Sequence, residues 1–266
     1  MNFGKFTRGR EQNQVIQEAI DRFQGAPGWA VHLPEDAAAF HLGTSEKARQ
    51  FQAVFSGIGA CAGWAESHVC LMETMHRFRY DLPRSYLEIG VMEGWSVLSM
   101  VTAVRLQKAR YAPDTVLAPL FDELVLADIW TSQSGGAGRG AHQRVENLLR
   151  AANVDLERVT FLDGDSKKTV PAYLKSRINR TPIDAIYIDG DHSYRGAKAD
   201  LENVLPYVGK ILFFDDIYHP VHCLEDRLLE LHLAMVSRLR QDFYVFLNRR
   251  GYGFAAYIRK DVFDAL

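Results

Sequence analysis

Cysteine is scarce in this chain, and its spacing matches neither a metal site nor a disulfide framework. The three cysteines, Cys61, Cys70 and Cys223, form no C-x-x-C pair. An odd and sparse set is typical of a protein from a reducing compartment. Each cysteine is therefore expected to be a small buried hydrophobic residue, and a cysteine-ligated zinc site is excluded.

Long apolar runs and an excess of one charge are also missing. No stretch approaches the ~20 apolar residues that a membrane helix needs, and no apolar segment follows the basic start to form a secretory signal. The net charge is −2, which gives no electrostatic reason to bind nucleic acid or an anionic membrane. These absences predict a cytoplasmic protein with neither partner. The oligomeric state stays open, a homodimer included.

The 266 residues are 47% hydrophobic and 24% charged, an ordinary globular balance with enough chain for one large domain and an extension. Residues 1–82 show helical periodicity and no convincing strand, interrupted by Gly57, Gly59 and Gly63. We predict a helical extension over residues 1–82, which either covers a pocket or packs on the main sheet or a partner chain. A second domain is predicted over residues 83–266.

From residue 86 onward, short β-rich apolar runs alternate with helical segments. Continuous apolar strands separated by helices indicate a parallel sheet covered on both faces, and right-handed crossovers make it doubly wound. Two later runs, Phe243–Arg249 and Tyr252–Arg259, are close enough in sequence to form an antiparallel hairpin. The predicted class is an α/β, Rossmann-like, mostly parallel sheet. Its parallel strands are Tyr86–Val91, Glu123–Trp130, Val159–Asp165, Ile183–Asp189 and Gly209–Asp216.

The first of these strands ends in a glycine-containing loop, Glu88-Ile-Gly90-Val-Met-Glu-Gly94-Trp-Ser96. Gly90 permits a tight turn out of the strand, and Gly94 lets a ligand approach the backbone. A dinucleotide fingerprint requires the spacing G-x-G-x-x-G, which this loop lacks. Ligands of open parallel sheets bind beyond the carboxyl ends of the strands, so this loop is the expected binding site.

The pattern acidic-x-Gly-x-x-x-Gly-x-Ser resembles the first motif of class I S-adenosylmethionine-dependent methyltransferases. The resemblance implies that the loop of Gly90, Gly94 and Ser96 wraps the methionine end of the cofactor and that Glu88 orients its amino group. At the end of the second strand, Asp128 is suited to accept hydrogen bonds from both ribose hydroxyls.

The third strand ends in Leu162-Asp-Gly-Asp165-Ser166. In the family this strand end reads the adenine amino group, which implies a role for Asp165 and Ser166. Asp163 is the open alternative, because a one-residue error in the end of the strand exchanges the two aspartates.

Carboxylates gather at the ends of the fourth and fifth strands. Asp189, Asp215 and Asp216 are expected at one edge of the sheet, and three oxygen donors suit a hard cation such as Mg²⁺. Aspartates at strand ends also cap helices, so that alternative stays open for Asp189 and Asp216. His192 follows in the sequence Asp189-Gly-Asp-His192-Ser-Tyr194.

These motifs resemble a subgroup of methyltransferases that includes macrolide-sugar and, more distantly, catechol O-methyltransferases. The resemblance implies that Asp189, Asp215 and Asp216 are metal ligands, that Asp189 takes part in catalysis, and that His192 is the general base. His192 as a plain turn residue remains the alternative. Asp191 is expected either to orient His192 or to cap the following helix.

The leading hypothesis is therefore an S-adenosylmethionine-dependent methyltransferase that modifies a hydroxyl of a small metabolite, such as a sugar or polyphenol, with Mg²⁺ as a further cofactor. Transfer to nitrogen stays open. The competing hypotheses are an NAD-dependent oxidoreductase and a non-methylating enzyme that binds S-adenosylmethionine on the same scaffold. A serine hydrolase is disfavoured, because no G-x-S-x-G turn follows a strand.

Overall fold

A computed structural model describes residues 81–112, 118–130, 140–177, 181–219, 227–248 and 252–265, with scattered single residues between 67 and 78. The predicted helical extension over residues 1–82 lies almost wholly outside the described residues. Two of the three cysteines, Cys61 and Cys223, also lie outside them, whereas Cys70 is buried. None of the helices in the described part has the length and apolarity needed to cross a bilayer.

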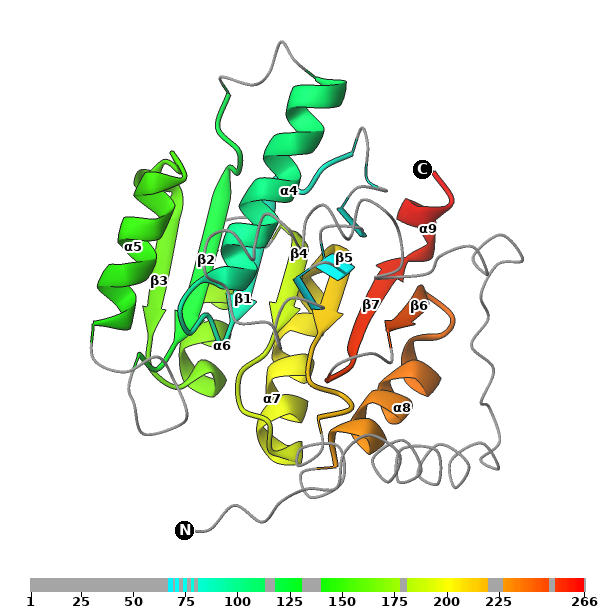
Figure 1. Ribbon diagram of the computed structural model, residues 1–266. Coiled ribbons are helices and arrows are strands. Elements are labelled where there is room, and N and C mark those ends of the chain that lie inside the picture. The colour runs from blue at the N-terminus through cyan, green and yellow to red at the C-terminus, as the bar shows by residue number, and fades with distance from the viewer. Residues whose placement is uncertain are drawn as a thin grey trace, which may run out of the picture.

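One seven-stranded sheet forms the centre of the molecule, in the order β3-β2-β1-β4-β5-β7-β6 (Figure 1). The first five strands along the chain are parallel, and the hairpin of β6 and β7 joins β5 antiparallel through β7. The predicted mostly parallel α/β sheet with its C-terminal hairpin is thus confirmed. The strands are β1 Ser85–Ile89, β2 Glu123–Asp128, β3 Val159–Asp163, β4 Ile183–Ile188, β5 Val208–Phe214, β6 Phe243–Asn248 and β7 Phe254–Arg259.

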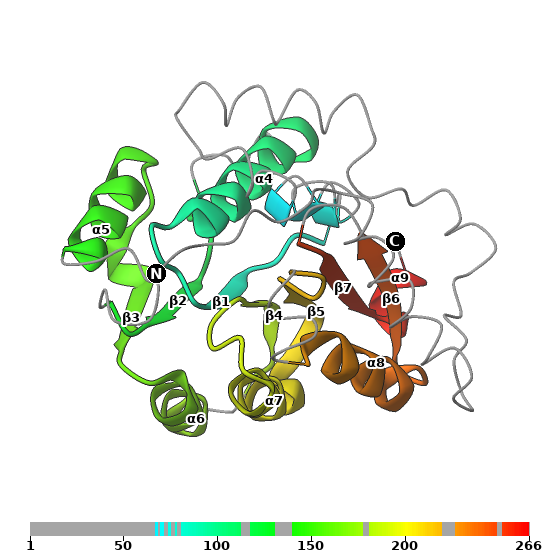
Figure 2. The ribbon, with the colours of Figure 1, turned by 60° about the horizontal axis from the view of Figure 1, so that its bottom comes forward.

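Helices cover both faces of this sheet (Figure 2). Cover on both faces is expected for strands that are mostly apolar. A final short helix, α9, follows β7. The helices are α4 Trp95–Tyr111 and α5 Ala141–Ala151 on one face, α6 Ser166–Ser176, α7 Tyr194–Val204 and α8 Leu228–Leu239 on the other, and α9 Lys260–Phe263.

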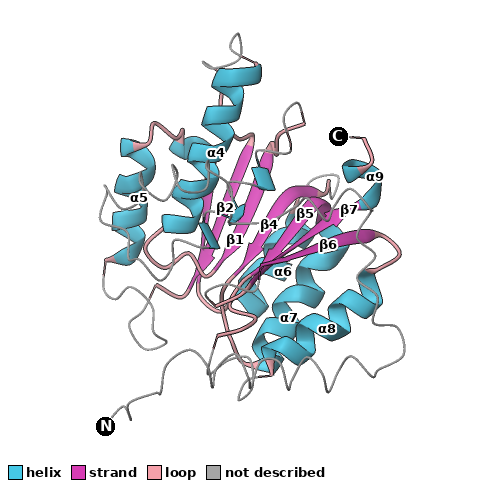
Figure 3. Ribbon diagram, turned by 45° about the vertical axis from the view of Figure 1, so that its right-hand side comes forward, coloured by secondary structure: helices cyan, strands magenta, loops and turns pink. Residues whose placement is uncertain are grey.

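The two faces of β1 belong to two separate hydrophobic clusters. Leu87 and Ile89 pack in the cluster of α6, α7 and α8, whereas Tyr86 packs in the cluster of α4 and α5. Figure 3 shows the strands lying between these helices. Since side chains alternate along a strand, Glu88 shares the face of Tyr86 and projects toward α4.

The order of the strands reverses beside β1. Strands β2 and β3 follow on one side of it, and β4 and β5 follow on the other. In doubly wound sheets this reversal opens a crevice at the carboxyl ends of the strands, where ligands bind. The fold therefore places the candidate site at the loops that follow β1 to β5.

Candidate active site

Backbone hydrogen bonds tie the loops at the carboxyl edge into one rim. Gly90 N–H donates to the Ala127 carbonyl at 2.9 Å, and Gly164 N–H donates to the Asp128 carbonyl at 2.9 Å. On the other side, Asp189 N–H donates to the Ile89 carbonyl at 2.9 Å and Asp215 N–H donates to the Ile188 carbonyl at 3.1 Å. The loops that carry the predicted site residues are therefore held next to one another.

The loop after β1 turns tightly against the loop after β4. Gly90 has a φ of +88°, and a Cβ built there would lie 1.9 Å from the backbone oxygen of Asp189. Gly94, with a φ of +84°, caps α4, and its Cβ would press on Val145 and Leu148 of α5 at 3.2 and 3.1 Å. Both glycines are thus required by the backbone and by close packing.

Glu88 is fully buried at the start of this loop. The Tyr86 hydroxyl donates to its Oε2 at 2.6 Å, and the Ser96 hydroxyl donates to its Oε1. Burial raises the pKa of Glu88 to about 8, although these two hydrogen bonds oppose the shift. No cationic side chain contributes to this shift, so a ligand cation beside Glu88 would stabilise its ionised form.

This shift predicts a pH-dependent stability that Glu88→Gln removes. The folded-state pKa of about 8 exceeds the ordinary value of 4.5, so between these values the folded chain holds a proton that the unfolded chain releases. The wild type should therefore lose stability relative to Glu88→Gln as the pH rises through this window. Melting temperatures of both proteins across that range check this, and parallel curves would contradict it.

Asp128 joins the loop after β1 to the loop after β2. Its Oδ2 accepts from Met92 N–H at 2.7 Å, and its Oδ1 accepts from Trp130 N–H at 2.8 Å. Met92 and Trp130 have φ angles of 52° and 51°, a strained region for residues other than glycine. Asp128 thus stabilises two turns at the place predicted for the ribose, and each oxygen retains a second lone pair for a hydroxyl donor.

Of the three polar residues proposed for the adenine end, Asp163 lies beside Asp128. The two aspartates are register partners in β3 and β2, and Asp163 Oδ1 lies 3.5 Å from His142 Nδ1. Asp165 caps α6 by accepting from Lys167 N–H at 3.1 Å, and the Ser166 hydroxyl donates to Asp200 at 2.8 Å. Asp163 is therefore the aspartate paired in register with Asp128, and the adenine role of these residues stays a prediction.

An aromatic group that the sequence did not reveal borders Asp163. The ring of His142 stacks on Trp130 with centroids 5.0 Å apart and lies 4.2 Å from Phe161. His142 is the second residue of α5 and lies outside the strand-end motifs in sequence. Only the packing of α5 on β3 brings it to the rim, so motif analysis carried no signal for it.

His192 lies between two carboxylates at the rim. Its Nε2 is 3.1 Å from Asp189 Oδ1 and 3.4 Å from Asp216 Oδ2. The three side chains offer one donor atom each, all within 4.8 Å of one another. Asp216 holds its position with a φ of 58°, a backbone strain that is found often at functional sites.

The structure differs from the predicted metal ligands at Asp215. Its Oδ1 accepts from the Ser67 hydroxyl at 2.8 Å and from Asp216 N–H at 2.9 Å, and its Oδ2 accepts from the Tyr187 hydroxyl. Asp215 is buried and is not in the group of Asp189, His192 and Asp216. The side chain of Asp215 is thus held by Tyr187 and Ser67, while its charge still acts on Asp189, and its role as a metal ligand stays a prediction.

Burial and mutual repulsion dominate the electrostatics of these carboxylates. Burial, followed by the charges of Asp189 and Asp215, raises the pKa of Asp216 to about 8. Burial and the charges of Asp215, Glu88 and Asp128 raise the pKa of Asp189 well above its ordinary range. The interaction with His192 opposes the shift at Asp216, so the site favours positive charge.

Comparison with known proteins places this geometry in a family. Residues 87–217 match a family model described as a methyltransferase domain. This stretch is a methyltransferase domain. A search of curated protein sequences finds no match.

Solved structures share the fold of the methyltransferase domain and its surroundings. CalS11, a TDP-rhamnose 3′-O-methyltransferase of calicheamicin biosynthesis, is 20% identical with a TM-score of 0.51, covering 98% of this chain and 99% of its own. TomG, an O-methyltransferase from Streptomyces achromogenes, is 16% identical with a TM-score of 0.52, covering 84% and 93%. An O-methyltransferase from Bacillus cereus is 13% identical with a TM-score of 0.51, covering 85% and 96%.

The methyltransferase domain contains the predicted site residues of all five strand ends. Gly90 and Gly94 lie in the loop after β1, between Glu88 in β1 and Ser96 in α4. Asp128 ties that loop to the end of β2. Asp189, His192 and Asp216 come together at the ends of β4 and β5. Asp165, Ser166 and Asp215 have other partners within the domain.

Proposed function

We propose that this protein transfers a methyl group from S-adenosylmethionine to a hydroxyl of a small molecule, with His192 as the general base. The observation that carries the proposal is the group of Asp189, His192 and Asp216 on the same rim as Glu88 and Asp128. Two observations favour this function over NAD-dependent oxidation. Residues 87–217 match a methyltransferase domain, and the loop after β1 lacks the dinucleotide fingerprint.

The reaction needs three things from the chain. The acceptor oxygen must lie in line with the methyl–sulfur bond, so that the new oxygen–carbon bond forms as the carbon–sulfur pair moves to sulfur. The hydroxyl proton must leave, and histidine titrates near neutral pH. The cofactor must be held by its amino group and ribose, for which we propose Glu88 and Asp128.

The two carboxylates beside His192 support its role as a base. Once the imidazole takes the acceptor proton, the ring carries a positive charge. Asp189 Oδ1 and Asp216 Oδ2, at 3.1 and 3.4 Å from Nε2, stabilise that imidazolium through charge-assisted contacts. We assign to Asp189 this catalytic role, which does not require a metal.

The same three side chains fit a divalent cation. Two carboxylate oxygens and one imidazole nitrogen are ligands that Mg²⁺, Mn²⁺ or Fe²⁺ accept in proteins. A bound cation would orient the acceptor hydroxyl and lower its pKa, and His192 would then be a ligand and not the base. In either case Asp215 supports the position of Asp216, because it accepts a hydrogen bond from the backbone N–H of Asp216.

Removing divalent metal separates these two roles of His192. If His192 is the base, turnover should persist in excess chelator, and elemental analysis of the purified protein should find no stoichiometric divalent metal. If the group is a metal site, turnover should fall to background and return with Mg²⁺ or Mn²⁺. Retention of cofactor binding in chelator is the control, because Glu88 and Asp128 need no metal.

Calorimetry and a transfer assay test the proposed function. S-adenosylmethionine and S-adenosylhomocysteine should bind with measurable heat, and NAD should not. CalS11 acts on a nucleotide-linked sugar, so labelled-methyl transfer is measured on a panel of nucleotide sugars, catechols and matched amines. Binding of NAD would contradict the proposal. Cofactor binding without transfer to any member would favour the non-methylating alternative.

Asp128→Ala should weaken binding of S-adenosylhomocysteine by roughly 10- to 100-fold, since hydrogen bonds to a charged group are each worth about 1.5–3 kcal/mol. The two strained turns at Met92 and Trp130 also lose their acceptor. Asp155→Ala is the matched control, because Asp155 likewise accepts from a backbone N–H, that of Glu157, but far from the rim. Equal affinities of the Asp128 variant and wild type would remove the ribose role.

A further inference from the structure

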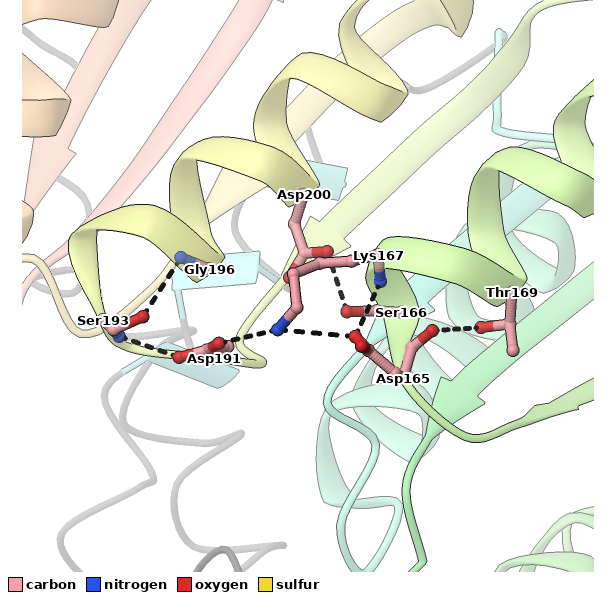
Figure 4. Close-up of polar contacts among 8 residues, drawn as sticks. All are labelled: Asp165, Ser166, Lys167, Thr169, Asp191, Ser193, Gly196 and Asp200. Atoms are coloured by element: carbon pink, nitrogen blue, oxygen red, sulfur yellow. Dashed lines mark hydrogen bonds and ion pairs between the residues drawn. The ribbon is translucent and has the colours of Figure 1, made fainter.

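The loop between β4 and α7 carries His192, and its neighbour Asp191 has an unusual set of contacts (Figure 4). Asp191 Oδ1 accepts from Ser193 N–H at 3.0 Å, and its Oδ2 accepts from Lys167 Nζ at 2.9 Å. Ser193, not Asp191, caps α7, because its hydroxyl accepts from Gly196 N–H at 3.1 Å. The carboxylate of Asp191 is thus held from both sides without being the cap of the helix.

Gly196 in the first turn of α7 makes room for this carboxylate. A Cβ built at Gly196 would lie 2.0 Å from Asp191 Cγ and 2.1 Å from its Oδ2. Glycine inside a helix costs about 1 kcal/mol relative to alanine, so the sequence accepts a poorer helix former where the side chain of Asp191 lies. The backbone of α7 and Asp191 are therefore in direct steric contact.

Lys167 brings a second helix into this arrangement. It belongs to α6, and its Nζ also lies 3.4 Å from Asp165 Oδ1. The hydrogen bond to Asp191 leads the contacts that raise the pKa of Lys167. Burial alone would raise the pKa of Asp191, but its hydrogen bonds from Lys167 and Ser193 lower it. Both groups are therefore charged near neutral pH, and the pair links the start of α6 to the loop of His192.

A buried contact supports the other side of the loop. Asp200 of α7 is fully buried and accepts from the Ser166 hydroxyl of α6 at 2.8 Å. Its second oxygen would lie 3.4 Å from a Cβ at Gly190, the residue before Asp191. The loop is thus enclosed by α6 and α7, and one side chain, Asp191, connects it to both.

We propose that Asp191, placed against Gly196 and held by Lys167, is a positioning residue that fixes the loop on which His192 meets Asp189 and Asp216. The inference deepens the proposed function and rests on it for the role of His192. Exposed ion pairs contribute only about 0.2–1 kcal/mol, so the steric contact with Gly196 is the stronger constraint. Losing Lys167 should therefore loosen the loop, and filling the space at Gly196 should displace it.

Histidine-labelled protein gives a direct test that needs no methyl acceptor. The ring resonance of His192 is assigned by its loss in His192→Gln. We expect Gly196→Ala and Asp191→Ala to shift or broaden this resonance, and Lys167→Met to do so less. Lys167→Arg should restore the wild-type signal, since it keeps the charge. Lys198→Met is the matched control, because it breaks a Lys198–Glu202 pair on the same helix away from the loop.

Turnover and cofactor binding of the same variants give the second readout. With an acceptor from the panel, Gly196→Ala and Asp191→Ala should lower kcat by about 10- to 100-fold and leave the affinity for S-adenosylhomocysteine within about twofold. The melting temperature of Gly196→Ala should lie at most a few degrees below that of the wild type, because alanine favours the helix. A fall in affinity equal to the fall in kcat would indicate a general loss of structure and overturn the positioning role.

The failure of the inference differs from the failure of the proposed function. An unchanged His192 resonance in Gly196→Ala, Asp191→Ala and Lys167→Met would overturn the positioning role, whatever the wild type binds. Absence of S-adenosylhomocysteine binding in the wild type would overturn the proposed function. A Cβ at Gly196 would lie 2.5 Å even from Asp191 Cβ, so only glycine at position 191 removes these contacts. The resonance of the double variant Asp191→Gly with Gly196→Ala should therefore match that of Asp191→Gly alone; an additive effect would contradict the steric contact.

Discussion

Gly90→Ala is expected to abolish binding of S-adenosylmethionine. A methyl group at this position would lie 1.9 Å from the backbone oxygen of Asp189 and 2.9 Å from Gly190 Cα, and neither is a flexible side-chain end that can move aside. The strand ends of β1 and β4 must separate to admit it. We expect at least a 100-fold loss of affinity by calorimetry, together with a lower melting temperature, since overpacking typically costs 1–3 kcal/mol.

Gly140→Ala is the matched control for this change. Gly140 has nearly the same backbone angle, a φ of +84°, but the nearest atom to a Cβ there is the end of the Arg144 side chain at 3.7 Å. The Gly140→Ala variant has the cost of an alanine in the left-handed region, about 1–2 kcal/mol, but its Cβ collides with no neighbouring backbone. Similar losses of affinity in both variants would show that backbone strain, and not the contact of β1 with β4, controls the site.

His192→Gln is expected to lower kcat by about 10²- to 10⁴-fold, the usual contribution of a positioned general base. Glutamine keeps a polar side chain near Asp189 and Asp216 but cannot take up the acceptor proton. The affinity for S-adenosylhomocysteine should stay within about twofold, because the proposed contacts to the cofactor come from Glu88 and Asp128. Turnover and calorimetry on one preparation check this.

The pH profile of turnover gives an independent measure of His192. With a base that must be neutral, the wild-type rate should rise with pH through the titration of a histidine. The residual rate of His192→Gln should lack that rise. If His192→Gln keeps the wild-type kcat, or keeps the same rise of rate with pH, the proton transfer belongs to another group.

The strands were predictable because their signal is local. Runs such as Ile183–Ile188 are apolar at every position except Asp184, and burial on both faces of a parallel sheet favours this pattern. The ends of the strands were less predictable: the prediction carried the third strand to Asp165, whereas β3 ends at Asp163. Gly164 and Asp165 fit the end of a strand or the cap of a helix equally well. Only the hydrogen bonds between the strands therefore decide where β3 ends.

Pairs of neighbouring acidic residues show where motif analysis stops. Asp215 and Asp216 are equivalent as letters in the sequence, yet one is buried against Tyr187 and Ser67 and the other lies 3.4 Å from His192 Nε2. The left-handed backbone of Asp216 turns the chain between them. Backbone conformation at a single residue is set by contacts from distant segments, which the local sequence does not encode.

By itself the sequence determined the alternation of strands and helices, the glycine loop after the first strand, and the acidic residues at successive strand ends, since each follows from the chemistry of neighbouring residues. Tertiary structure decided which side chains meet: Asp163 is the register partner of Asp128, and Asp216 joins Asp189 and His192. It also brought His142 and Lys167 to the rim. The physical reason is that such meetings depend on strand register and helix packing, which join segments far apart in the chain.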